Sequence, residues 1–332
     1  RSFHVTGVQT CALPISLARN AMATRFEMVL HGEDELGLRA AGEEALDEIT
    51  ALASQLNFYG ADSEITRINA GAALGPVPVE PGLFRLLQEA KGVHGLSGGA
   101  FDITVAPLMR CWGFADGKHR VPSPGELAKA RECVGMDLVH LDAKTFTVQF
   151  ERPGVRVDLS AIGKGFALEI AGEILREAGV TSALIHGGTS TVCAIGSPPA
   201  EAFWKTAIEH PGWGQPDADI PERKRLVAVA KLRDEALSVS AVWGRAFEER
   251  GVSYGHVLDP RSGLPAQNAL LAAVALPSGT AADARSTALL VSGGAGLAAL
   301  GQVGESSRSL LLLPDGNSGF RTLNDGFDLP ER

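Results

Sequence analysis

Two side chains that could hold a divalent cation lie four residues apart in the last third of the chain. Asp283 and Thr287 fall in a segment that we predict to be helical, and residues four apart share one face of a helix. A carboxylate and a hydroxyl are hard oxygen ligands, which suit Mg²⁺ when water and substrate phosphate complete its shell. An Asp/Thr pair at this spacing is also common at a helix start on the surface. The spacing alone therefore leaves both interpretations open.

A glycine-rich turn, Ser160 to Gly165, could bind phosphate. Its glycines let a ligand approach the backbone, the amides of the following helix favour an anion, and Lys164 adds a positive charge. It is not a P-loop, because Asp158 stands where the first glycine is required. It is not a Rossmann fingerprint either, because Leu168 replaces the third glycine. A phosphate-binding turn and an ordinary connection with a solvated lysine remain the two alternatives.

His256 precedes a strong turn sequence, Asp259 to Gly263. A histidine in this position could act as a general base or polarise a ligand, although an ordinary loop histidine fits the pattern too. The sequence contains no HxxH or HExxH pair, which disfavours a zinc hydrolase. Gly95 to Gly99 matches Gly-x-Ser-x-Gly, but it follows a predicted helix rather than a strand, which disfavours a serine hydrolase.

The elements that must position these residues follow from hydrophobic periodicity. Around the glycine-rich turn we predict a strand at Val155–Ser160, a helix at Phe166–Ala178 that ends at Gly179, and a strand at Ala183–Ile185. The other predicted strands are Thr24–Leu30, Trp204–Glu209, Leu226–Leu232, Ala236–Val239, Leu270–Leu276 and Ser309–Leu313, together with a β meander over Met136–Leu159. The other predicted helices are Glu33–Leu56, one capped by Asp62 or Ser63, Pro81–Val93, Ser123–Cys133, Val242–Glu249, Ala281–Val291 and Ala295–Leu300. Mixed hairpins with interspersed helices indicate an α+β fold.

Composition sets the class of protein. The chain has 332 residues, 45% of them hydrophobic and 21% charged, which is enough for a substantial core. Its net charge of -9 argues against a nucleic-acid or anionic-membrane surface, so a phosphorylated ligand needs a local cation. The longest uncharged run, Ser286–Gly304, contains five glycines and fits buried helices better than a membrane span.

The first residues are expected to be foreign to the fold. Val5 to Ile15 resembles the translation of a sequencing-library adapter, so we set residues 1–16 apart as non-native. We predict a single domain of two lobes over residues 17–320 and a loose tail over residues 321–332. A signal peptide or lipid anchor could have been lost, so both the cell envelope and the cytoplasm remain open as the compartment.

Six stretches in order resemble the FAD:protein FMN transferase family, the ApbE-like flavin transferases, from Met22 to about Leu313. They are MATRF, FYGADSEITRIN, GGAFDITVAPLMRCWGF, VDLSAIGKGFALEIAGEILREAGV followed by a Gly-Gly pair, YGHVLDPRSGLP and ADARSTALLV. The resemblance implies an α+β fold with mixed, largely antiparallel sheets flanked by helices, and two lobes around an FAD cleft. It also implies Mg²⁺-dependent cleavage of FAD, which passes FMN to a threonine hydroxyl of an acceptor protein and releases AMP.

The resemblance assigns roles to individual residues. The metal site would comprise the backbone carbonyl of Ala161 with Asp283 and Thr287, and the catalytic residues would be His256 and Lys164. The FAD-binding positions would be Met22, Tyr59, Ala100, Phe101, Asp102, Asp158, Lys164 and His256. The implied partners are FAD and an acceptor with a threonine flavinylation motif, such as a redox-pump subunit.

This chain also departs from the family pattern. A histidine and two glycines, His186 to Gly188, are followed by Thr189 where an acidic residue is usual, Ser240 to Trp243 replaces Ser-Gly-x-Tyr, and Ser262 replaces threonine. These changes bear on substrate geometry and acceptor choice. Two alternatives to a transferase stay open: an FAD pyrophosphatase that gives FMN and AMP, and a non-catalytic flavin-binding or flavin-delivery protein.

Overall fold

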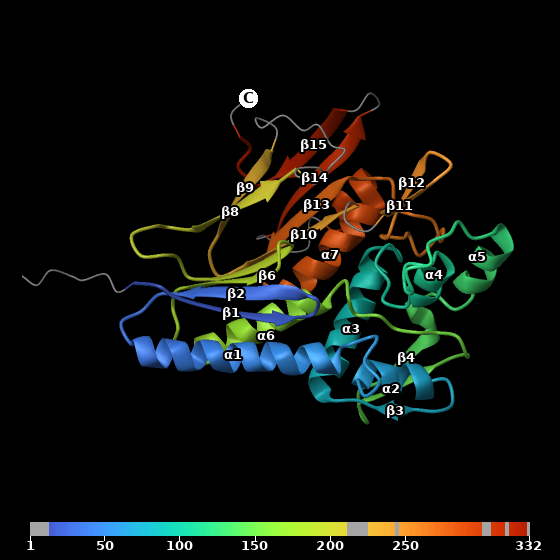
Figure 1. Ribbon diagram of the computed structural model, residues 1–332, viewed down its shortest axis with the longest axis horizontal. Helices are drawn as coiled ribbons and strands as arrows, with labels where there is room; N and C mark the ends of the chain where they lie inside the picture. The colour runs from blue at the N-terminus through green and yellow to red at the C-terminus, as the bar shows by residue number, and fades with distance from the viewer. Residues whose placement is uncertain (1–12, 211–224, 243–245, 301–306, 316–318, 331–332) are drawn as a thin grey trace, which may run out of the picture.

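An eight-stranded antiparallel sheet forms the centre of the molecule (Figure 1). The computed structural model describes residues 13–210, 225–242, 246–300, 307–315 and 319–330. The strand order is β1-β2-β6-β7-β10-β13-β14-β15, and each neighbouring pair is antiparallel. The strands are β1 Ile15–Ala21, β2 Thr24–Leu30, β6 Ala183–Gly187, β7 Thr191–Ile195, β10 Ala236–Ala241, β13 Leu271–Leu276, β14 Arg308–Asp315 and β15 Gly319–Asp325.

Three helices cover one face of this sheet: α1 Glu35–Gln55, α6 Gly163–Glu177 and α7 Gly279–Ser292. A fourth helix, α3 Pro81–Leu96, packs on α7. Helix α1 runs alongside β1 and β2, α6 lies against both α1 and α7, and α7 packs on β10 and β13 (Figure 1). The main hydrophobic core fills the space between these helices and the sheet.

The other face of the sheet has its own apolar cluster. The strands β8 Trp204–Glu209 and β9 Leu226–Leu232 pair with each other and contribute to this cluster. Strand β10 contributes side chains to both faces of the sheet, because successive side chains of a strand point to opposite sides. Leu237 and Val239 belong to this second cluster, while Ser238 and Ser240 contact residues of α7 on the helical face.

The remaining elements gather mainly at one side of the molecule (Figure 1). They are α2 Glu64–Gly71, α4 Ala106–Cys111, α5 Pro124–Arg131, α8 Leu297–Leu300, the three-stranded sheet β3 Val77–Pro78, β5 Thr147–Phe150 and β4 Val139–Asp142, the hairpin β11 Ala246–Glu249 and β12 Val252–Gly255, and short 3-10 helices at Met136–Leu138 and Gly293–Gly296. Among the described residues, no helix combines the length and the apolar character that crossing a membrane requires.

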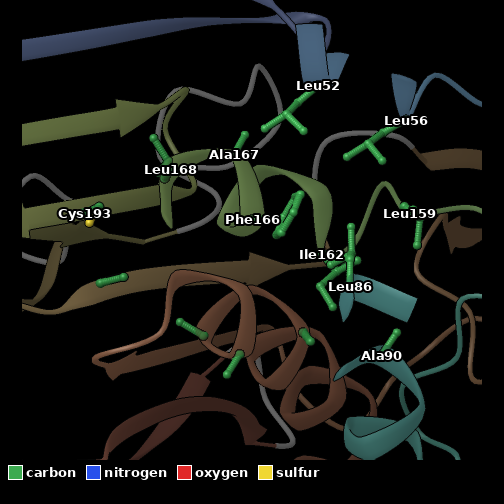
Figure 2. Close-up of a cluster of buried hydrophobic side chains, with 14 of the residues drawn as sticks. Leu52, Leu56, Leu86, Ala90, Leu159, Ile162, Phe166, Ala167, Leu168 and Cys193 are labelled. Atoms are coloured by element: carbon green, nitrogen blue, oxygen red, sulfur yellow. The ribbon is translucent and has the colours of Figure 1, made fainter. Parts of the chain in front are cut away.

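The start of α6 is embedded in the main core. Leu159 and Ile162 lie just before the helix and Phe166 lies in its first turns, and Figure 2 shows them among Leu52, Leu56, Leu86 and Ala90. All of these side chains are buried. Burying a large aliphatic or aromatic side chain contributes roughly 1.5–3 kcal/mol, so this cluster holds the turn before α6 in place.

The α+β class and most elements are confirmed, but four expectations about local structure are wrong. Val155–Leu159 is extended and alternates buried and half-buried side chains, yet it joins no sheet. The side-chain amide of Asn69 instead bonds both the N–H and the carbonyl of Val157. The predicted helix at Val242–Glu249 is contradicted by β11, which pairs with β12 across a turn where Arg250 and Gly251 have positive φ.

The two chain ends are the other corrections. Gly319–Asp325 is the strand β15 and Phe327 is buried, so the chain beyond residue 320 does not begin as a loose tail. Residues 1–12 lie outside the described residues, as does Trp243. Ile15 and Ser16 belong to β1 and pair with Leu30 and Val29, so the non-native segment predicted over residues 1–16 does not extend through these two residues.

Candidate functional site

The site lies where one edge of the sheet meets the starts of α6 and α7. Across the sheet, Phe26 pairs with Gly187, Gly187 with Thr191 and Thr191 with Ser238. This register brings the turns that follow β1 and β6 to the same edge as the middle of β10. Helix α7 packs on β10 and α6 packs on α7, so residues from five distant stretches of sequence meet here.

Asp283 is the buried carboxylate of this region. One oxygen, Oδ1, accepts a hydrogen bond from the Ser238 hydroxyl at 2.9 Å, and Oδ2 accepts one from the Gly165 N–H at 2.9 Å. Lys164 Nζ lies 3.9 Å from Oδ2, and the Asp283 side chain is only 5% exposed. Two donors and an ammonium therefore fix the carboxylate in one orientation.

Thr287 lies one turn further along α7, and its hydroxyl is 3.1 Å from the Ser240 hydroxyl. Asp283, Thr287 and Lys164 thus come together, as the sequence predicts. The donor set fits Mg²⁺, because carboxylate and hydroxyl oxygens are hard ligands. The part of the chain that is described holds no cluster of three or more His, Cys, Asp or Glu side chains that could hold a metal ion.

Close contact between α6 and α7 depends on two glycines. A Cβ at Gly165 would lie 2.1 Å from the Gly279 carbonyl oxygen and 2.7 Å from Asp283 Cβ. A Cβ at Gly279 would lie 2.7 Å from the Gly165 carbonyl oxygen. One turn later on α6, Glu169 accepts hydrogen bonds at 2.8 Å from the Ser278 hydroxyl and the Thr280 N–H. Gly165 and Glu169 therefore set the position of α7 on α6.

The turn before α6 holds Ala161 and Asp158. The N–H groups of Ile162 and Gly163 both donate to the Leu159 carbonyl, which folds the chain back toward the helix. Ala161 is half-buried in this turn and packs on the main core. The Asp158 N–H donates to the Ile103 carbonyl at 2.7 Å, so Asp158 adjoins the segment that contains Ala100, Phe101 and Asp102.

The side chains of that segment face the interior. Ala100 and Phe101 are each 1% exposed. Asp102 accepts hydrogen bonds from the Thr104 N–H and hydroxyl through Oδ1, and its Oδ2 lies 3.2 Å from His94 Nδ1. The predicted FAD contacts at these three residues would therefore involve backbone atoms rather than side chains. The Asp102 carboxylate raises the pKa of His94. The sequence did not indicate His94 as the partner of Asp102.

Met22 and Tyr59 differ in how they are held. Met22 and Ala23 form the two-residue turn between β1 and β2, both with positive φ, which is strained for residues other than glycine. Thr24, next to this turn, lies against Gly188 at the end of β6. Met22 packs on the main core, as does Ala161. Tyr59 is 69% exposed and its ring contacts Phe58, so the structure places it at the surface.

His256 follows the β11–β12 hairpin, and its ring is 6.5 Å from that of Phe114. The turn after it is rigid, because Arg261 donates to both carboxylate oxygens of Asp259 and the Trp112 indole donates to the Gly263 carbonyl. Val257, the next residue, packs in a small cluster that contains Ala100 and Val291 of α7. His256 is thus connected to α7 and to the Ala100 segment through its neighbour.

Half-buried charged side chains of α3, α6 and α7 lie near one another, at Glu89, Glu169 and Arg285. Burial raises the pKa of Glu89, and the nearby Glu169 carboxylate raises it further. Burial lowers the pKa of Arg285 on α7, against the opposing effect of Glu89. Arg285 is two residues from both Asp283 and Thr287, which places it on the opposite side of α7 from them.

Sequence reasoning missed the serines of β10. Ser238 contacts Asp283 and Ser240 contacts Thr287, whereas the sequence predicts only that both lie in or next to a strand. A signal was present, because two serines at alternate positions share one face of a strand. On a face that packs against a helix, buried hydroxyls need polar partners.

Known proteins match this chain over most of its length. The model of the ApbE family matches residues 22–306. The FAD:protein FMN transferase of Haemophilus influenzae is 30% identical over 289 residues, covering 84% of this chain and 81% of that protein. The FAD:protein FMN transferase of Vibrio cholerae is 29% identical over 264 residues, covering 78% of this chain and 75% of that protein.

Solved structures agree with the sequence matches. The ApbE protein of Thermotoga maritima superposes with a TM-score of 0.82 at 26% identity, covering 94% of this chain and 97% of that chain. The flavinyl transferase ApbE of Pseudomonas stutzeri, in its apo form, gives a TM-score of 0.81 at 26% identity, covering 94% of this chain and 95% of that chain. The predicted fold and family resemblance are confirmed by these matches.

Proposed function

Because the chain belongs to the ApbE family, we propose that it transfers FMN from FAD to a threonine hydroxyl of an acceptor protein, releases AMP and depends on Mg²⁺. The observation that carries this proposal is the meeting of Lys164, Asp283 and the start of α6. An ammonium lies 3.9 Å from a buried carboxylate, beside helix amides that favour anions. This combination suits a cation and a pyrophosphate bound side by side.

The ligands for Mg²⁺ would be the Asp283 carboxylate, the Thr287 hydroxyl and the Ala161 carbonyl. When bound, the ion would neutralise charge on the phosphates and make AMP a better leaving group. Asp283 is suited to this role because, among the described residues, each of its oxygens accepts one hydrogen bond, and a carboxylate oxygen has room for a further partner.

The reaction itself requires only modest chemistry from the side chains. The acceptor threonine oxygen forms a bond to the FMN phosphorus, the pyrophosphate bond on the other side of that phosphorus breaks, and AMP leaves with the bridging oxygen. Lys164 would stabilise negative charge on the phosphate oxygens. His256 would take the threonine proton or orient the pyrophosphate, and its rigid turn would keep the ring in place.

Other residues would bind the rest of FAD. Met22 in the β1–β2 turn, Asp158 and the backbone of Ala100 to Asp102 border the same region, and Tyr59 is available at the surface. Water in place of threonine would give FMN and AMP, so FAD pyrophosphatase activity is the natural second candidate. The buried, fully oriented Asp283 favours catalysis over mere flavin binding, since a binding protein does not need a metal carboxylate.

The test is to incubate the protein with FAD, with and without Mg²⁺ and with an acceptor domain that carries a threonine flavinylation motif. AMP release and flavin fluorescence of the denatured acceptor are followed together. We expect both to require Mg²⁺ and to fall at least about 100-fold in Asp283→Asn, which keeps the side-chain shape but removes the charge. FAD binding without any AMP release would refute the catalytic proposal, and AMP without labelled acceptor would favour a pyrophosphatase.

A further inference from the structure

A chain of hydroxyls runs from the half-buried Thr287 side chain to the backbone carbonyl of Asp283, and a separate serine hydroxyl bonds the Asp283 carboxylate. Ser240 Oγ lies 3.1 Å from Thr287 Oγ1 and 2.8 Å from Ser286 Oγ. Ser286 donates to the backbone carbonyl of Asp283 at 3.0 Å, and Ser238 donates to the Asp283 carboxylate at 2.9 Å. Ser238 and Ser286 are fully buried, so bulk water does not compete for their hydrogen bonds.

The proton positions along this chain follow from counting, because each hydroxyl carries one hydrogen and can accept from others. The Ser286 hydrogen goes to the Asp283 carbonyl at 3.0 Å rather than to Ser238 Oγ at 3.4 Å. Ser286 Oγ must then accept the hydrogen of Ser240, which is 2.8 Å away. Ser240 has no second hydrogen to give, so it accepts from Thr287.

This order leaves the Thr287 hydroxyl with its only hydrogen committed to Ser240. What it presents elsewhere is a lone pair, which is what a cation requires of an oxygen ligand. A Thr287 hydroxyl without this acceptor could rotate and point its hydrogen at the ion. The Ser238 hydroxyl has the matching effect on the carboxylate, since it holds Asp283 Oδ1 in a single orientation.

We propose that Ser240 and Ser286 are positioning residues that fix the direction of the Thr287 hydroxyl, and thereby set the affinity of the site for a divalent cation. The inference rests on the proposed metal site, and it adds residues that act through Thr287 rather than touching substrate. It also gives a role to Ser240, which begins the Ser-Ala-Val-Trp stretch that departs from the family pattern.

The experiment is a Mn²⁺ titration followed by electron paramagnetic resonance, with the full chain in the absence of FAD and again with ADP present to supply a pyrophosphate. Partners that orient a metal ligand typically change metal affinity about 10–100-fold when they are removed. We therefore expect Ser240→Ala and Ser286→Ala each to weaken Mn²⁺ binding about 10-fold. Ser240→Thr, which keeps the hydroxyl, should bind within about twofold of the wild-type protein.

Ser309→Ala is the matched control, because Ser309 is a buried serine of β14 that lies outside the hydroxyl chain. Thermal unfolding of every variant shows whether it is folded. If one alanine variant does not fold, the other alanine variant is compared with Ser240→Thr. Wild-type Mn²⁺ affinity in a folded Ser240→Ala variant would overturn this inference and leave the proposed function intact. No Mn²⁺ binding by the wild-type protein, with or without ADP, would overturn the metal assignment and this inference together.

Discussion

Among the single residues of the site, the Lys164 ammonium lies beside the carboxylate of Asp283, to which we propose that the divalent cation binds. Lys164 Nζ is 3.9 Å from the Asp283 oxygen that also accepts from Gly165. A divalent cation bound to this carboxylate would lie close to the ammonium and repel it. Lys164 is 23% exposed, so it has room to turn toward a phosphate when a metal is bound.

Because the Lys164 ammonium and a divalent cation compete for the Asp283 carboxylate, Lys164→Met should change metal affinity and catalytic rate in opposite directions. Without FAD, the variant should bind Mn²⁺ about twofold to fivefold more tightly than the wild-type protein, the range expected when a partly exposed ion pair is removed. Its rate of AMP release should nevertheless fall, because the charge on the phosphate side is lost. Mn²⁺ titration and AMP assays on the same preparations measure both effects. Lys205→Met removes a surface ion pair with Glu201 and should change neither, while weaker Mn²⁺ binding in Lys164→Met would contradict the argument.

His94 should make the stability of the protein depend on pH. The Asp102 carboxylate raises the pKa of His94 above its ordinary value of 6.5, so protonated His94 is favoured in the folded state. The stabilisation from this pair is complete below pH 6.5 and is lost as the pH rises through the raised pKa. Urea unfolding between about pH 5.5 and pH 8.5 should show this loss, and His94→Gln should lack it. An unchanged pH profile in the variant would show that another group is responsible.

Some of the site could be predicted from the residues alone, and some could not. The spacing of Asp283 and Thr287 is enough to place them on one helix face. The partners that orient them lie on β10, some 45 residues away in sequence, at Ser238 and Ser240. The alternation of the two serines indicates a polar strand face, but only the strand register decides that this face meets Asp283 and Thr287.

At the scale of elements, the α6–α7 contact determines the site geometry. Gly165 and Gly279 allow the two helices to touch backbone to backbone, and the Gly165 N–H holds Asp283. The helix after the glycine-rich turn was predictable from its apolar period. The preceding strand was not correctly predicted, because the Asn69 side chain replaces a neighbouring strand as the partner of Val157. A strand in a sheet and a segment bonded by a side chain show the same alternation of buried residues, so this alternation cannot distinguish them.

Gly165→Ala tests this contact directly. The added Cβ would meet the Gly279 carbonyl oxygen at 2.1 Å, so the helices must separate. We expect a loss of roughly 1–3 kcal/mol in the free energy of unfolding, as for other overpacked cores, together with weaker Mn²⁺ binding. Gly92→Ala in α3 is the control, since its Cβ would meet nothing within 4 Å. It should stabilise the helix by about 0.5–1 kcal/mol. Equal unfolding energies for the two variants in urea would refute the account.

At the scale of the whole molecule, the last strand completes the sheet. The predicted mixture of hairpins and helices indicated an α+β fold, but residues 321–332 were predicted to be a loose tail. Strand β15 pairs with β14 along seven residue pairs, and Phe327 is buried in the cluster on the far face of the sheet. Burial of Phe327 and the pairing of β15 therefore hold this segment on the fold.

Phe327→Ala should therefore destabilise the protein. Truncating a buried phenylalanine costs about 3–5 kcal/mol, and Phe327 also packs under the Arg308 guanidinium. Leu329→Ala is the comparison, because Leu329 is 49% exposed and should lose less than about 0.5 kcal/mol. Chemical unfolding gives both values. A stability for Phe327→Ala that equals that of Leu329→Ala would mean that the chain end does not contribute to the fold.

Counting both products in one reaction tests whether the protein transfers FMN to threonine. The protein, FAD and Mg²⁺ are mixed with the acceptor domain or with the same domain carrying valine in place of its threonine, and AMP and acceptor mass are measured together. We expect one AMP for each acceptor that gains FMN, and no mass gain for the valine acceptor. Equal AMP release with both acceptors, and FMN on neither, would contradict this expectation.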